Sequence, residues 1–159
     1  MLMLVALLLI VTSILLFTKG AAATPGDTRA EALSQQYDEV TKAARAETLA
    51  FLTVDYKNMD PLIDKVLAGS TGTFKEQYES AKDTLKQTAE QGQSVATGDV
   101  KAVGIGDINA DTAVVFVGAD GSVTNKSTAG KAQPRAYRFK LTMVHKGDKW
   151  LVSDLQILS

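Results

Sequence analysis

The sequence predicts an α+β protein, in which an N-terminal transmembrane helix precedes helices that pack on a curved antiparallel sheet. Three patterns indicate this fold class: an apolar segment, a middle third with apolar side chains at helical spacing, and alternating apolar side chains beyond Gly92. The chain has 159 residues, which leaves room for one folded domain behind the apolar segment. We therefore expect a single α+β domain on a membrane anchor.

The apolar segment predicts a membrane anchor over residues 1–20. Residues 2–18 carry no charge, and every Lys, Arg, Asp and Glu lies from Lys19 onward. A helix rises about 1.5 Å per residue, so this run covers roughly 25 Å, at the short end of what crosses a bilayer. Two other interpretations stay open, a cleaved signal peptide ending near Ala21-Ala22-Ala23 and a buried core helix. The lack of a basic residue before Lys19 disfavours the signal peptide.

A linker over residues 21–27 and a soluble domain over residues 28–159 are expected next. Thr24-Pro25-Gly26 should interrupt a helix, and Asp27 or Thr28 can cap the following one. Apolar positions at helical spacing then predict a long helix that continues to about Tyr56.

Two more helices are predicted before the strands begin. Asp60 can cap a short helix over residues 61–67, because Pro61 suits the first helical position. A third helix is expected from about Gly72 to Gln91, with its apolar side chains on one face.

Alternating apolar and polar residues predict an antiparallel sheet with one buried face. Tyr137, Phe139, Leu141 and Met143 show the alternation most clearly. The expected strands are residues 94–108, 112–117, 135–145 and 150–158, with turns at Asp120-Gly121 and at residues 146–149. Residues 118–133 allow either a long exposed hairpin or a mobile loop. Three helices followed by such strands suggest a half-open α+β cone.

Composition excludes several kinds of function. The formal net charge is −1 and the basic residues are scattered, so no nucleic-acid partner is predicted. There is no cysteine, and His145, at the end of a hairpin, is the only histidine. The carboxylates lack the spacing of a calcium loop, and Gly104-Ile105-Gly106 has no helix after it to form a phosphate site. We expect no metal, no cofactor and no catalytic residue.

One set of polar residues leaves a catalytic interpretation open. Asp38, Asp55, Tyr56 and Arg138 would have to face a common pocket between the helices and the sheet. A carboxylate there would act as a general base if burial raised its pKa. The simpler interpretation is that these side chains cap helices, form ion pairs or face water.

Four motifs, in order, carry a resemblance to a known family. They are Phe51-Leu52-Thr53-Val54-Asp55-Tyr56, Asp60-Pro61-Leu62-Ile63-Asp64-Lys65-Val66-Leu67, Thr71-Gly72-Thr73-Phe74-Lys75-Glu76-Gln77-Tyr78 and Lys149-Trp150-Leu151-Val152-Ser153-Asp154-Leu155. Together they resemble the Mce-associated membrane proteins of actinobacteria, especially mycobacteria. The likeness covers nearly the whole chain.

The resemblance implies an NTF2-like, cystatin-like soluble domain held outside the inner membrane by a single-pass helix, in the extracytoplasmic (periplasmic) space. It also implies a non-enzymatic accessory subunit of an Mce-type lipid import complex of the cell envelope, with YrbE-type permeases, Mce subunits and membrane lipid as partners. The alternative is an extracytoplasmic module that binds a lipid or other hydrophobic ligand, or an NTF2-like enzyme, using the pocket of the cone. The residues assigned to membrane anchoring and permease contact are Leu2, Ala6, Leu9, Ser13, Leu16 and Phe17.

Overall fold

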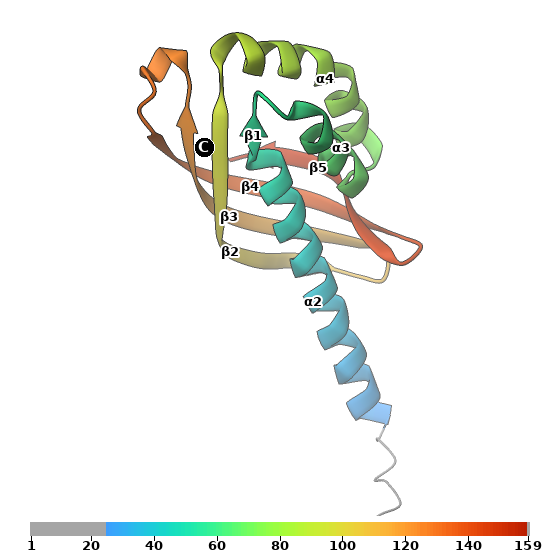
Figure 1. Cartoon of the computed structure of the whole chain (residues 1–159). Coiled ribbons are helices and arrows are strands. Elements are labelled where there is room, and N and C mark those ends of the chain that lie inside the picture. The colour runs from blue at the N-terminus through green and yellow to red at the C-terminus, as the bar shows by residue number, and fades with distance from the viewer. Residues whose placement is uncertain (1–24, 159) are drawn as a thin grey trace, which may run out of the picture. The chain divides into compact units, whose positions relative to one another are not determined.

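The computed structural model describes residues 25–158, and this part of the chain is α+β. Its three α-helices are α2 (Pro25–Leu52), α3 (Met59–Gly69) and α4 (Gly72–Gly92) (Figure 1). The chain divides into two units, residues 1–34 and residues 35–159, and the sheet belongs to the second. The predicted α+β class is confirmed at this level.

Five antiparallel strands form one sheet in the described part of the chain. They are β1 (Val54–Asp55), β2 (Val95–Ile108), β3 (Thr112–Thr124), β4 (Gln133–Lys146) and β5 (Lys149–Ile157). The strands lie in sequence order, so each pairs with the next along the chain. The register shifts twice between β2 and β3 and once between β4 and β5. Such bulges bend a sheet, and this one is visibly curved (Figure 1).

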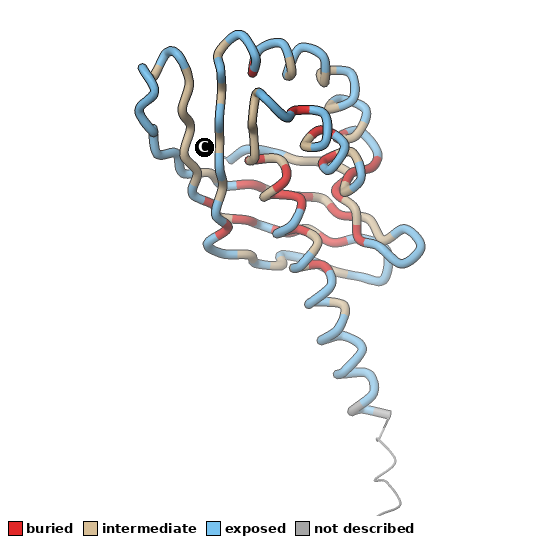
Figure 2. Tube along the Cα trace, viewed as in Figure 1, coloured by how far each residue is buried: buried red, intermediate tan, exposed pale blue. Residues whose placement is uncertain are grey.

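One face of the sheet supplies most of the core. In β4, Phe139, Leu141 and Met143 are buried completely, whereas Arg138, next to Phe139 in the alternation, is exposed. Val40 of α2 and Val66 of α3 belong to the buried set, which gathers where these helices meet the strands (Figure 2). The predicted alternation is thus confirmed, because successive side chains of a strand point to opposite faces.

The first helix is shorter at its C-terminal end than its sequence pattern predicts. Helix α2 ends at Leu52 and not near Tyr56, because Val54 and Asp55 form the short strand β1. These two residues pair with Ala96 and Val95 of β2. Val54 and Asp55 therefore fit a helical pattern in the sequence, but pairing with the distant strand β2 places them in the sheet.

The other helices follow the predictions more closely. Helix α4 agrees with its predicted span to within one residue, but α3 is longer than predicted and begins at Met59. Asp60 is therefore inside the helix and does not cap it; its carboxylate accepts a hydrogen bond from Lys86 Nζ at 2.7 Å. This contact ties the first turn of α3 to α4.

The N-terminal predictions are tested only in part. Pro25 and Gly26 are helical, so the expected interruption is wrong for these two residues; proline is compatible with the first turn of a helix. The predicted anchor, residues 1–20, lies outside the described residues. Within residues 25–158, no helix combines the length and apolarity needed to cross a bilayer.

Residues 118–133 form the outer part of the hairpin that joins β3 to β4. Strand β3 runs through Asp120 and Gly121, which pair with Asp99 and Gly98 of β2, so the turn predicted there is wrong. A 3-10 turn at Lys126–Thr128 closes the hairpin. Lys126 Nζ donates a hydrogen bond to the carbonyl of Gln91 at 2.9 Å, which joins the tip to the end of α4.

Candidate ligand-binding sites

An apolar groove opens beside α4 and β5 and has a volume of about 570 Å³. Helix α4 supplies one wall, while α2, β1, the start of α3 and β5 supply the rest. Its apolar lining consists of Phe51, Val54, Met59, Phe74, Tyr78, Ala81, Leu85, Ala89, Leu155 and Ile157. The volume and this lining are typical of a site for an apolar small molecule.

Aromatic rings pack against one another in the apolar groove. Phe51 meets Phe74 edge-on, with ring centroids 6.0 Å apart, and Tyr78 lies 6.0 Å from Phe74. Two of the lining residues, Leu85 and Ile157, are 39% and 65% exposed. Exposed large apolar residues beside an apolar hollow favour binding of a hydrophobic ligand.

The chemistry of the apolar groove is almost wholly non-ionic. Its polar lining comes from Gln77, Thr88, Ser94 and the hydroxyl of Tyr78, and no carboxylate, amine or imidazole is among the described residues that line it. Burial raises the pKa of Tyr78, so this hydroxyl stays neutral at physiological pH. The groove can therefore orient a ligand by hydrogen bonds, but it offers no acid–base pair.

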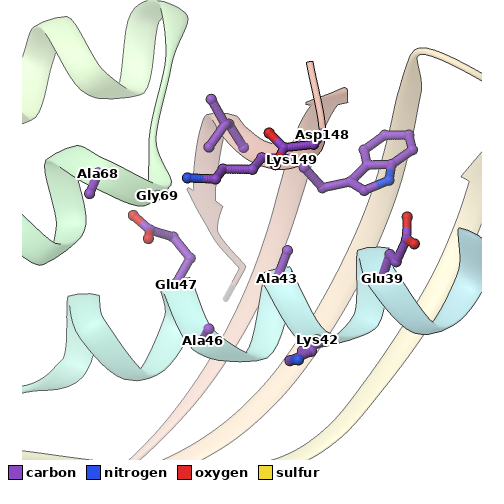
Figure 3. A pocket seen from close by; sticks show the side chains of 11 residues that line it. Glu39, Lys42, Ala43, Ala46, Glu47, Ala68, Gly69, Asp148 and Lys149 are labelled. Atoms are coloured by element: carbon purple, nitrogen blue, oxygen red, sulfur yellow. The ribbon is translucent and has the colours of Figure 1, made fainter. Parts of the chain in front are cut away.

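A second pocket lies on another side of α2 and has a volume of about 480 Å³. We call it the Glu47 pocket. Its lining comes from α2 (Glu39, Lys42, Ala43, Ala46, Glu47), from the end of α3 (Ala68, Gly69) and from the β4–β5 hairpin (Asp148, Lys149, Trp150, Leu151) (Figure 3). Glu47 extends from α2 toward the end of α3 (Figure 3). The pocket thus joins three elements that are distant in sequence.

Glu47 is an unusual residue for a core position. Only 4% of it is exposed, and burial raises the pKa of its carboxyl group to about 8, although the positive charge of Lys65 acts in the opposite direction. Within the described part of the chain, neither Glu47 Oε1 nor Trp150 Nε1 has a hydrogen-bond partner. Two buried polar atoms of opposite character, an acceptor and a donor, are therefore left unsatisfied at one pocket.

The polar residues considered for catalysis do not converge. Asp38 and Arg138 are exposed, whereas Asp55 is half-buried and accepts a hydrogen bond from the backbone of Lys57 at 3.0 Å. Tyr56 packs beside the small apolar cluster of α3. The structure therefore supports the simpler interpretation of this set.

His145 is less exposed than its place near a hairpin suggests. Its imidazole is half-buried and stacks on the indole of Trp150, with ring centroids 4.9 Å apart. The two residues are cross-strand partners in β4 and β5. Among the described residues, no group of three His, Asp or Glu side chains is placed to hold a metal ion.

Sequence reasoning missed Glu47, although a signal was present. Glu47 lies seven residues after Val40 and three after Ala44, on the same helical face as these buried residues. An acidic residue at a core position of an amphipathic helix indicates a buried carboxyl group. The predicted permease-contact residues Leu2, Ala6, Leu9, Ser13, Leu16 and Phe17 lie outside the described part, so that assignment stays a prediction.

Comparison with sequence families gives one match over almost the whole chain. The family described as "Uncharacterized protein Rv1363c/MT1408-like" matches residues 1–158. The protein Rv1363c of Mycobacterium tuberculosis is 28% identical over 130 residues, which cover 80% of this chain and 49% of that protein. The chain therefore spans about half the length of this curated relative.

Solved structures share the fold at low sequence identity. An IcmL-like type IV secretion system protein of Legionella pneumophila has a TM-score of 0.62 at 12% identity, over 76% of this chain and 91% of that one. The periplasmic domain of DotI has a TM-score of 0.60 at 12% identity, over 74% and 91%. A ketosteroid isomerase-like protein of Erwinia carotovora has a TM-score of 0.51 at 20% identity, over 77% and 95%. These likenesses identify an NTF2-like fold.

Proposed function

The chain belongs to the Rv1363c/MT1408-like family, and from that premise we propose that it is a non-enzymatic accessory subunit of an Mce-type lipid import complex. In this proposal, one helix within residues 1–20 crosses the inner membrane, and the NTF2-like domain lies on its outer side. The partners are a YrbE-type permease and Mce subunits, and the transported lipid is a fatty acid or a sterol. The resemblance of the four motifs to Mce-associated membrane proteins motivates this assignment.

The fold of related structures supports the proposed location. A domain of this fold forms the periplasmic part of DotI, and another is an IcmL-like protein of a type IV secretion system. The fold is therefore compatible with a role beside a membrane in a larger assembly.

Co-purification from the native host tests this assignment. The full chain carries a C-terminal tag, and mild detergent extraction is followed by mass spectrometry of the proteins that accompany it. We expect permease and Mce subunits to be recovered. Replacing Ala6 or Ser13 by a bulky residue should reduce recovery, because small residues allow close helix packing in lipid. Recovery of the intact chain without these subunits would contradict the proposal.

The apolar groove favours a second candidate function, the binding of a hydrophobic ligand by the domain itself. The observation that carries it is the volume of about 570 Å³ with an aromatic and aliphatic lining. An acyl chain or a sterol can fill such a space, since burial of apolar area supplies about 25 cal/mol per Å² and requires no charged partner. This candidate is compatible with an accessory role, because the subunit would then hold lipid during transport.

Lipid binding is tested with a variant that fills the apolar groove. Ala81 lines the groove on α4, whereas Gln87 is exposed on the same helix and does not line it. Native mass spectrometry of the full chain in detergent should show bound lipid in the wild type and in Gln87→Trp. The same measurement should show little bound lipid in Ala81→Trp. Equal lipid content in the two variants would assign the lipid to the membrane segment or to detergent exchange.

A further inference from the structure

Two residues that line the Glu47 pocket each have a buried polar atom without a hydrogen-bond partner among the described residues. Glu47 and Trp150 are 4% and 6% exposed, and an oxygen of one and the indole nitrogen of the other have no hydrogen-bond partner in the described part of the chain. A buried polar group without a partner is destabilising, because it has lost its hydrogen bonds to water, and such groups are uncommon in native structures. Both residues line the same cavity of about 480 Å³, but the two atoms themselves have almost no accessible surface. A molecule bound in the cavity would satisfy them once the two side chains turn toward it.

We propose that the Glu47 pocket binds a small organic ammonium ion that also carries a hydrogen-bond acceptor, as an amino alcohol does. The ammonium group donates to the Glu47 carboxylate, and the acceptor oxygen receives a hydrogen bond from Trp150 Nε1. The carbon chain between them lies against the methyl groups of Ala43 and Ala46, which also line the pocket. This site is separate from the apolar groove and does not depend on the proposed lipid function.

The charged side chains around the pocket, apart from Glu47, nearly balance, with three lysines against two carboxylates. The titratable groups that face or surround it are Glu39 and Lys42 of α2, Lys65 of α3, Tyr78 of α4, and Asp148 and Lys149 of the β4–β5 hairpin. No cationic side chain of the described residues lies within ion-pair distance of Glu47. The position of its counter-ion is therefore open to a ligand, and the attraction is stronger than in bulk water because Glu47 itself is buried.

A cationic ligand gives the acidic group at this place a role that a neutral ligand does not. A neutral ligand would leave the carboxyl group protonated, and a glutamine of the same shape would serve equally well. An ammonium ion instead pairs with the ionised carboxylate, so its binding displaces a proton from Glu47. Ammonium binding should therefore tighten as pH rises toward about 8, the pKa of Glu47 in the folded protein without ligand.

The fluorescence of Trp150 provides a direct assay, because it is the only tryptophan of the chain. The full chain, in mild detergent and an amine-free buffer, is titrated with amino alcohols of increasing length, with alkylamines and with diols of matched length. We expect amino alcohols to bind most tightly, alkylamines less tightly and diols weakly. Equal binding of the diols, or no response to any probe at any pH, would overturn the proposal.

Two matched variants separate Glu47 from carboxylates elsewhere on α2. Glu47→Gln should weaken binding of the amino alcohol roughly ten- to hundredfold, since a hydrogen bond to a charged group contributes about 1.5–3 kcal/mol. Asp38→Asn removes an exposed carboxylate of the same helix that does not line the pocket, and it should change binding by less than about threefold. Equal affinities of wild type and Glu47→Gln, measured also by thermal shift, would contradict the proposal.

Free amines and lipid headgroups share the ammonium chemistry. A further titration compares a free amino alcohol with detergent-dispersed lysophosphatidylethanolamine. Tighter binding of the lysolipid would identify a headgroup as the ligand, and tighter binding of the free amine would identify a soluble metabolite. Both results require the response to be lost in Glu47→Gln.

Discussion

The carboxylate of Glu47 occupies the space in which a side chain at position 69 would lie. A Cβ atom added to Gly69 would overlap Glu47 Oε2, well inside van der Waals contact. The end of α3 and the C-terminal part of α2 therefore approach closely only because residue 69 has no side chain. Any side chain at position 69 would therefore force Glu47 to move, and mutation of the two residues can test this coupling.

The Gly69→Ala substitution should lower the free energy of unfolding by about 1–3 kcal/mol, because the Glu47 side chain must move from its buried position. The loss should be smaller in a Glu47→Ala background, where the carboxylate is absent. Urea unfolding of the two single variants and the double variant measures this coupling. Gly104→Ala is the control, since an added Cβ there meets nothing within 4 Å. Strict additivity of the two substitutions would contradict the close contact.

Stability should depend on pH through Glu47. The carboxyl group has an ordinary pKa near 4.5 in the unfolded chain, and burial raises it to about 8 in the folded protein. Between these values the folded state binds more proton than the unfolded state, so stability falls as pH rises across this window and is level above it. Each unit of the pKa difference corresponds to about 1.4 kcal/mol, so the total is on the order of a few kcal/mol.

Glu47→Gln provides the comparison for this pH dependence. The variant has no proton to lose, so its stability should vary much less between the two ends of the window, and it should exceed the wild type above pH 8. Chemical unfolding at several pH values measures both slopes. If the wild type and Glu47→Gln had parallel profiles, the carboxyl group would titrate normally.

Arg45 supports the irregular part of strand β2. Its Nη1 donates a hydrogen bond of 2.7 Å to the carbonyl of Val100, next to a register shift in the pairing with β3. Arg45→Ala should cost about 1 kcal/mol, because this carbonyl loses a charge-assisted partner. Lys42→Ala, at an exposed position on the same helix, should have little effect in the same thermal unfolding assay. Equal melting temperatures for these variants would show that water replaces the guanidinium group.

Asn125 holds the tip of the β3–β4 hairpin. Its side chain accepts a hydrogen bond from the backbone of Thr128, while the Thr128 hydroxyl accepts one from the backbone of Asn125. Asn125→Ala should increase hydrogen exchange of residues 126–131 with little change in global stability. Lys131→Ala, exposed and near the same tip, should leave exchange there unchanged. Unaltered exchange in Asn125→Ala would show that the Lys126 contact with α4 is sufficient.

Local sequence patterns are good predictors where the local and the tertiary environments agree. The span of α4 and the alternation in β4 were predictable, because one face of each element meets the core and the other meets solvent. The end of α2 was not, because Val54 and Asp55 leave the helix to pair with residues about forty positions away. The dipeptide Asp120-Gly121 has the sequence of a turn, but β3 continues through it and pairs there with β2 on one side and β4 on the other.

The candidate sites were less predictable than the fold. The aromatic residues were assigned to a core, but which of them also line an open groove depends on how α4 lies beside β5. Asp38 and Asp55 were the acidic residues considered for catalysis, but Asp38 is exposed and Asp55 is only half-buried. The buried acidic residue is Glu47. Burial, and hence the pKa of a carboxyl group, follows from neighbours on other elements.

The sequence by itself determined the order of the helices and of the four long strands, the buried face of the sheet and the apolar character of residues 2–18, because these follow from the periodicity of side chains within one segment. Only the tertiary structure decided that Glu47 lies over Gly69 and beside the pocket that Trp150 lines. Those residues are far apart in the chain, so their shared exclusion from water is a property of the packing of α2, α3 and β5. The chemistry of the site depends on that exclusion.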